Sequence, residues 1–260
     1  MMALPTKTSV LTAFLFFTFL SAASAEFHTH PDFEKRSAHI KQISLLPPQI
    51  HMFEIGAGGT LEKMEAWSQA AGANIRKAMK EEFTKREYLQ LTEFDELTLS
   101  GPARLTYDET FLLYDVISND ILTHTFSTPS VHHTRTVVTT PFFSWKARDF
   151  SYALGKEVGM FTSSHVDAYL VVRGFDQRSS GGRKALGVGT ALVGAALGVA
   201  IIPQRGANLF WASLVDAHTG DILWFSRSLT PHDLRNSEEA TKLVLEFMTD
   251  LSTIGLPANP

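Results

Sequence analysis

Apolar residues recur every three or four positions along two long stretches of this chain, a spacing typical of helices that pack one face against a core. The first stretch has Thr60 as its predicted cap and runs to about Arg86. The second begins at Asn236, with Glu239 three residues later, and closes the chain near residue 251. Two further helices are predicted over residues 108–125 and 150–161.

Other stretches are apolar nearly throughout, or lie between turn residues, as strands do. Residues 166–172 predict a central strand that is covered on both faces. Residues 209–215 and 222–225 predict a hairpin, because Gly220 between them supplies the positive φ that such a turn needs. Shorter strands are predicted at 39–46, 51–55 and 88–91, a loop or edge at 126–145, and a flexible lead-in at 26–38.

This order of elements predicts an α/β (α+β) fold, in which helices pack on a mixed β-sheet. At 260 residues the chain is long enough for one large domain with a core of its own, which we expect over residues 39–255.

One segment does not fit that pattern. Residues 185–202, between Lys184 and Pro203, are eighteen consecutive positions without a charge, rich in Gly and Ala. A helix of that length would be about 27 Å long and would nearly span a bilayer, but a single crossing would separate the central strand from the hairpin. We therefore expect a Gly/Ala-rich apolar helical insertion before the hairpin, with both of its ends at the sheet.

Water is a poor solvent for such a segment, so it must meet the core, a second copy of the chain or a lipid surface. Small residues four apart would let a helix pack closely on another, and the basic residues before the segment would suit lipid phosphates. The sequence leaves these three alternatives open. The predicted contact residues for a membrane or partner are Arg178, Arg183, Lys184, Val193, Gly194, Leu197 and Gly198.

The amino terminus has the three regions of a secretory signal: Lys7, an apolar run at 10–20 and small residues up to Ala25. We expect cleavage after Ala25, because the apolar run is short for a membrane span. The chain has no cysteine, which excludes disulfides, thiolate metal sites and a lipid-bearing cysteine. These features predict an exported, periplasmic protein that is at most peripheral to a membrane.

Motifs that would indicate catalysis are missing from the sequence. Residues 56–60, Gly-Ala-Gly-Gly-Thr, precede a predicted helix but lack the Gly-Lys-Ser/Thr of a phosphate loop, so we interpret them as a sharp entry into the helix. No nucleophile elbow or zinc-protease helix occurs, and we expect no cofactor. A net charge of −4 argues against a nucleic-acid partner.

The predicted mature amino terminus could form one metal site. Cleavage after Ala25 would make Glu26-Phe27-His28 the new amino terminus, where the amine, two amides and the imidazole of His28 would form a square-planar Cu(II) or Ni(II) site.

Several motifs resemble those of a family of exported bacterial proteins. They are Phe-Ser-Tyr-Ala-Leu-Gly at 150–155, Ser-Gly-Gly-Arg-Lys-Ala at 180–185 with the glycine-rich run after it, Ala-Ser-Leu-Val-Asp-Ala-His-Thr-Gly-Asp-Ile-Leu-Trp-Phe at 212–225, and Leu-Leu-Pro-Pro at 45–48. The resemblance implies export but no activity. At the level of fold the chain is similar to envelope assembly proteins, such as curli-secretion lipoproteins and the amino-terminal domain of the Tol-system propeller protein, although it lacks their lipid-bearing cysteine.

Together these observations predict a non-catalytic envelope protein that acts by association with a membrane, an envelope assembly or a second copy of itself. The alternative is a periplasmic enzyme or small-ligand-binding domain whose site the sequence does not reveal.

Overall fold

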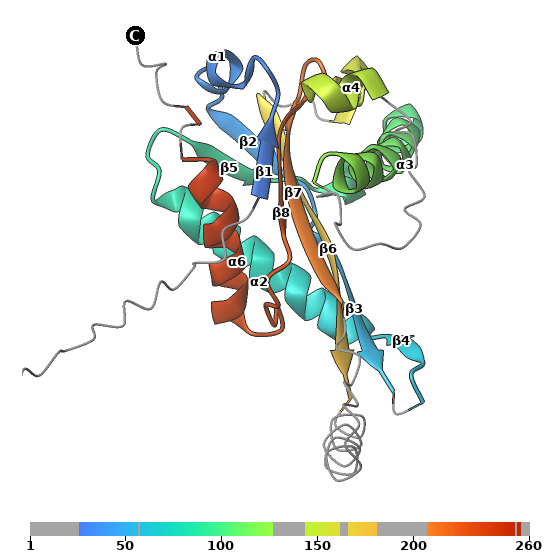
Figure 1. The fold of residues 1–260 in the computed structure, drawn as a ribbon. Helices are drawn as coiled ribbons and strands as arrows, with labels where there is room; N and C mark the ends of the chain where they lie inside the picture. The colour runs from blue at the N-terminus through green and yellow to red at the C-terminus, as the bar shows by residue number, and fades with distance from the viewer. Residues whose placement is uncertain are drawn as a thin grey trace, which may run out of the picture.

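A mixed sheet with helices on both faces forms the body of the protein (Figure 1). The computed structural model describes residues 26–56, 58–126, 144–161, 166–180, 207–252 and 254–255. The described elements are β1 (Glu26–Thr29), α1 (Phe33–Ser37), β2 (Gln42–Leu45), β3 (Gln49–Ile55), β4 (Leu61–Lys63), α2 (Glu65–Thr84), β5 (Gln90–Glu93), the 3-10 helix η1 (Glu96–Thr98), α3 (Gly101–His124), α4 (Ser144–Asp149), the 3-10 helix η2 (Lys156–Phe161), β6 (Ala168–Ser179), β7 (Asn208–Asp216), β8 (Ile222–Ser228) and α6 (Ser237–Asp250).

The sheet has eight strands in the order β1-β8-β7-β6-β2-β5, and β3 pairs with β6 beyond β2 while β4 pairs with β3. Strands β2 and β3 run parallel to β6, whereas β7 runs antiparallel to it. The predicted mixed sheet with packed helices is therefore confirmed, as is the hairpin of β7 and β8.

A one-residue irregularity separates β2 from β3 along their shared partner β6. Leu45 lies opposite Leu170 and Gln49 lies opposite Arg173, so three residues of one strand face two of the other. Pro47 and Pro48, which cannot donate to a ladder, fall in this break. Because side chains alternate along a strand, the extra residue moves Ile50 to the same face as Leu45 and turns His51 to the opposite face.

The two faces of the sheet carry separate apolar cores. Side chains of α2 and α6, including Ile75 and Phe247, pack with Leu170 and Phe210 on one face. Side chains of α3 and η2, including Tyr114 and Phe161, pack with Tyr169 and Phe225 on the other. Figure 1 shows β3, β4, β6 and β7 continuing past α3 and α4, so this second layer of helices leaves part of the sheet uncovered.

The predicted start of the first long helix is wrong. Strand β3 is followed by a reversal into β4, where the Gly56 amide donates to the Thr60 carbonyl at 2.9 Å and Gly59 has a φ of 84°. Helix α2 begins at Glu65 instead. Gly59 therefore supplies a positive φ for a strand reversal, and not for a helix entry.

Residues 26–38, predicted as a flexible lead-in, form β1 and α1. Strand β1 pairs with β8 from Glu26 opposite Arg227 to Thr29 opposite Trp224. Its polar residues suit the edge of a sheet. Its partner strand lies about two hundred residues later in the sequence, since Glu26 pairs with Arg227.

The helix predicted over 150–161 is also wrong in part. Phe150 has a φ of 47°, Ala153 bridges to Asp221, and only Lys156–Phe161 is helical, as η2. The apolar residues at this spacing are buried as predicted, including Leu154 and Val158. Leu154 packs from irregular backbone beside the β7–β8 turn, where its amide donates to the Gly220 carbonyl, and Val158 packs from η2.

The closing helix begins where the sequence predicts it. Asn236 caps α6 by accepting a hydrogen bond from the Glu238 amide at 2.8 Å. Glu239, however, does not close a capping box, since its carboxylate contacts His232 at 3.1 Å and Lys242 at 2.6 Å. The predicted signal peptide at 1–25, the apolar segment 185–202 and most of 126–145 lie outside the described residues.

Candidate functional site

Of the predicted contact residues, only Arg178 lies in the described part of the chain. Its Nε donates to Asp176 at 2.5 Å and its Nη2 donates to the carbonyl of His232 at 2.5 Å. The side chain thus ties the end of β6 to the segment before α6. Arg183, Lys184, Val193, Gly194, Leu197 and Gly198 lie outside the described residues, and their role stays a prediction.

The two strands on either side of residues 181–206 are paired where the chain leaves the sheet and where it returns. Asp176 of β6 lies opposite Asn208 of β7, and the Gln177 amide donates to the Ala207 carbonyl at 2.9 Å. The Asn208 side chain holds this end of β7 by donating to two carbonyls, those of Leu229 and Thr230, at 2.9 and 3.0 Å. The chain therefore leaves the sheet and returns to it at the same end of two paired strands.

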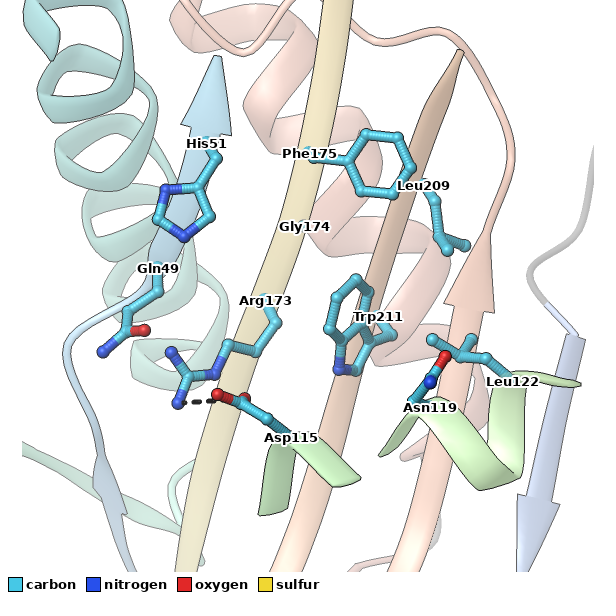
Figure 2. Close-up of a pocket in the computed structure, with 10 residues that line it drawn as sticks. All are labelled: Gln49, His51, Asp115, Asn119, Leu122, Arg173, Gly174, Phe175, Leu209 and Trp211. Carbon is cyan, nitrogen blue, oxygen red and sulfur yellow. Dashed lines mark ion pairs between the residues drawn. The ribbon is translucent and has the colours of Figure 1, made fainter. Parts of the chain in front are cut away.

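A pocket of about 320 Å³ lies on the sheet face that α3 only partly covers (Figure 2). Strands β3, β6 and β7 form its floor and α3 forms one wall. Figure 2 shows Arg173 and Trp211 side by side at its centre, with His51 on one side and Asn119 on the other. The lining residues are Gln49, His51, Asp115, Asn119, Leu122, Arg173, Gly174, Phe175, Leu209 and Trp211.

Arg173 is the most unusual residue of the pocket, because its side chain is only 7% exposed. Its Nη2 lies 3.7 Å from Oδ1 of Asp115, which is beyond hydrogen-bond distance, and that carboxylate is 59% exposed. The guanidinium lies over the rings of Phe111 and Tyr114, at 4.9 and 5.6 Å from their centroids. Among the described residues, Nε of Arg173 has no hydrogen-bond partner.

Two neighbours add to the polar character of the pocket. Trp211 Nε1 is also buried without a partner among the described residues. Burial lowers the pKa of His51, and the positive charges of Lys63 and Arg173 lower it further, which keeps the imidazole neutral at pH 7. The pocket therefore offers hydrogen-bond donors and one positive charge next to apolar side chains.

A second polar cluster lies on the opposite face, under α6. His232 is buried between two carboxylates, with Nδ1 at 3.1 Å from Glu239 and Nε2 at 2.8 Å from Glu246. Ser228 donates to the other oxygen of Glu246 at 2.7 Å. Burial opposes protonation of His232, but the hydrogen bonds to Glu246 and Glu239 outweigh it and raise the pKa. These groups satisfy one another and leave no donor for a ligand.

His28, the residue of the copper hypothesis, packs inside the sheet edge. Its ring lies 4.6 Å from that of Phe126 and 5.6 Å from that of Phe150, measured between centroids. A square-planar site at this terminus would require β1 to leave β8, because the site uses backbone amides and the imidazole. Within the described residues there is no group of three or more metal-ligating side chains.

Comparison with known proteins gives no relative: no protein-family model matches the chain, and no curated protein matches it. None of the helices in the described ranges is long and apolar enough to cross a membrane.

The pocket was not predicted from the sequence. Its polar residues are spread from Gln49 to Trp211 and meet only through strand pairing. The sequence contained one sign of it. Arg173 directly follows the nearly apolar stretch 166–172, and a charged residue is rarely found in a buried strand unless it has a specific role.

Proposed function

We propose that this protein is an exported, non-catalytic protein of the cell envelope, which associates with a membrane surface through residues 185–202. The observation that carries the proposal is the pairing of Asp176 with Asn208, because the chain leaves the sheet before residues 185–202 and returns after them at the same end of two paired strands. A segment tethered in this way can enter and leave the same side of a bilayer, and the sheet then stays intact.

The charge around the segment supports this assignment. Arg183 and Lys184 directly precede it, and Arg205 follows it within three residues of its end. Basic residues beside an apolar stretch favour anionic lipid headgroups, at about 1 kcal/mol each near the surface. The predicted signal at 1–25 would bring the chain to the envelope, where such a surface exists.

The composition of the segment supports it as well. Residues 185–202 are eighteen consecutive positions without a charge, and such a stretch is costly to leave in water. A lipid surface supplies an apolar environment for it.

Vesicle flotation of the mature protein tests the proposal. We expect the protein to float with anionic vesicles, and Leu197→Asp to abolish flotation while leaving the thermal melt unchanged. The matched control is Leu112→Asp on α3, which places the same charge on a leucine that is 69% exposed on the described body and should float like the wild type.

The other interpretations give different results. If the wild type ignores vesicles and Leu197→Asp unfolds it, the segment belongs to the core and membrane association is refuted. Crosslinking in intact cells, with a photoreactive residue in place of Val193, distinguishes lipid contact from contact with another protein. Crosslinks to lipid support the proposal, whereas crosslinks only to protein would replace it with an envelope assembly or a second copy of the chain.

A further inference from the structure

The weakly paired charge of Arg173 indicates a ligand site that is independent of residues 185–202. A buried guanidinium is stable when its donors meet acceptors and its charge meets a counter-charge. Arg173 has one carboxylate at 3.7 Å, which is largely exposed to water, and a buried Nε without an acceptor in the described part of the chain. An anion in the pocket would satisfy both requirements.

The neighbouring groups define the shape of that anion. The Trp211 indole offers a second buried Nε1 donor without a partner among the described residues, and it lies beside Arg173 in the pocket (Figure 2). Phe175 and Leu209 add apolar surface on the same floor. A ligand with an anionic end and a flat apolar body would place the first at the donors and the second against these side chains.

The charge of the pocket limits that of the ligand. Asp115 is the one carboxylate among the lining residues, and it points toward Arg173 from α3. A second negative charge on the ligand would meet no second Lys or Arg among the lining residues and would be desolvated without a partner. A single carboxylate can instead accept two parallel hydrogen bonds from the guanidinium at the cost of one repulsive contact. A volume of about 320 Å³ suits a small ligand.

We infer that the pocket between β3, β6, β7 and α3 binds a small organic monoanion, a carboxylate on a flat apolar group, with its carboxylate at Arg173 and its flat face against Trp211 and Phe175.

Fluorine NMR of the mature protein labelled with 5-fluorotryptophan tests the inference, with 1-naphthoate as the probe. The chain has four tryptophans, and Trp211→Phe assigns the resonance of the pocket. We expect 1-naphthoate to shift the Trp211 resonance saturably. The neutral 1-naphthamide should bind at least about tenfold more weakly, because it has no negative charge to pair with the guanidinium and cannot accept two parallel hydrogen bonds from it. Trp224, fully buried in the other core, reports whether the fold is intact.

Two variants separate ligand binding from a structural ion pair. Arg173→Met removes the charge while filling the space, and should weaken naphthoate binding by about tenfold or more. Asp115→Asn removes the repulsive carboxylate and should tighten binding, and this exposed residue can be changed even if the first variant fails to fold. The inference is overturned if naphthoate gives no saturable shift, if naphthamide binds equally well, or if Asp115→Asn leaves the affinity unchanged.

Discussion

Carboxylates of this protein differ sharply in their surroundings, as Asp250 and Asp233 show. Asp250, at the end of α6, is half-buried beside Ser226, which donates to it at 3.1 Å. Burial raises the pKa of Asp250 to about 6, and the negative charge of Glu246 adds to this increase. Asp233 instead accepts two hydrogen bonds from Arg235, at 2.8 and 2.7 Å, and these lower its pKa.

Asp250→Asn should therefore stabilise the protein at neutral pH. Because the pKa of Asp250 is higher in the folded state than its ordinary 3.8, the folded state loses stability as the pH rises toward about 6 and the group ionises. We expect the variant to unfold like the wild type at pH 3.5 and to be more stable by about 1 kcal/mol above pH 7, a figure reduced for solvent screening. Urea unfolding across this pH range measures the difference.

Asp233→Asn is the matched control with the opposite sign. Its folded pKa lies below 3.8, so the carboxylate stabilises the fold above that pH and the contribution disappears on acidification. The variant should be less stable than the wild type at pH 7 and equal to it at low pH. If the difference in unfolding free energy between wild type and variant does not vary with pH for either variant, then burial does not raise the pKa of Asp250 and the hydrogen bonds from Arg235 do not lower that of Asp233.

At the scale of elements, the amino-terminal segment is locked to the β7–β8 turn by one side chain. Arg36 of α1 donates to Asp221 at 2.7 Å, and to Asp216 and Thr219 at 2.6 Å each. Burial disfavours the charges, but the hydrogen bonds from Arg36 outweigh it and lower the pKa of both Asp216 and Asp221. The two carboxylates can lie together in the turn because the guanidinium lies between them.

Arg36→Met should destabilise the protein by about 2 kcal/mol at pH 7, since it leaves two partly buried carboxylates facing each other. Arg104→Met is the control, because its pair with Asp108 lies along one exposed face of α3, with side chains 43% and 50% exposed. That change should cost far less stability than Arg36→Met, because an exposed ion pair contributes little. Chemical unfolding compares the two variants, and equal losses would show that the Arg36 contacts do not hold the turn.

The elements that could be predicted from sequence are those whose signals are local. Helix α6 has a capping Asn236 followed by an apolar stripe, and the β7–β8 hairpin has Gly220, whose φ is 75°. Both were predicted within a few residues. The structure gives a second reason for a glycine at position 220. A Cβ there would lie 2.1 Å from the Gly155 carbonyl oxygen, which belongs to a loop remote in sequence.

Features that depend on distant partners could not be predicted. Strand β1 is short, and the partners that order it are remote in sequence, above all its pairing with β8. The glycines of residues 56–60 suit a helix entry equally well, and pairing of Ile55 with Leu61 decides for a hairpin. The pocket combines residues of four elements, so the buried charge of Arg173 was its single local signal.

At the scale of the whole molecule, the two sides of the sheet are unequal. Helices α2 and α6 pack on one face, whereas α3 and α4 stop short of the end of the sheet at which β6 ends and β7 begins (Figure 1). The pocket lies on this half-covered face, and Arg178 lies at the sheet end itself, anchored to Asp176. Arg178 and Arg183 were both predicted as contact residues, and the bonds of Arg178 to Asp176 and to the His232 carbonyl give it a role in the fold as well.

Removing positive charges that precede residues 185–202 should distinguish a residue that stabilises the fold from residues that bind the membrane. Asp176 is only 3% exposed, so Arg178→Gln would leave a buried carboxylate poorly paired and should destabilise the protein by about 2 kcal/mol. We expect its binding to anionic vesicles to remain close to that of the wild type, because the Arg178 guanidinium is already engaged by Asp176 and the His232 carbonyl.

The double variant Arg183→Gln/Lys184→Gln should behave in the opposite way, with unchanged stability and vesicle binding weakened by about tenfold or more, since each basic residue near an anionic surface contributes about 1 kcal/mol. The loss should shrink at high salt, where headgroup charges are screened. Vesicle sedimentation and chemical unfolding on the same samples measure both quantities. If Arg178→Gln weakens binding as much as the double variant while its fold remains stable, then its ion pairs open at the membrane, and the sheet end itself contacts lipid.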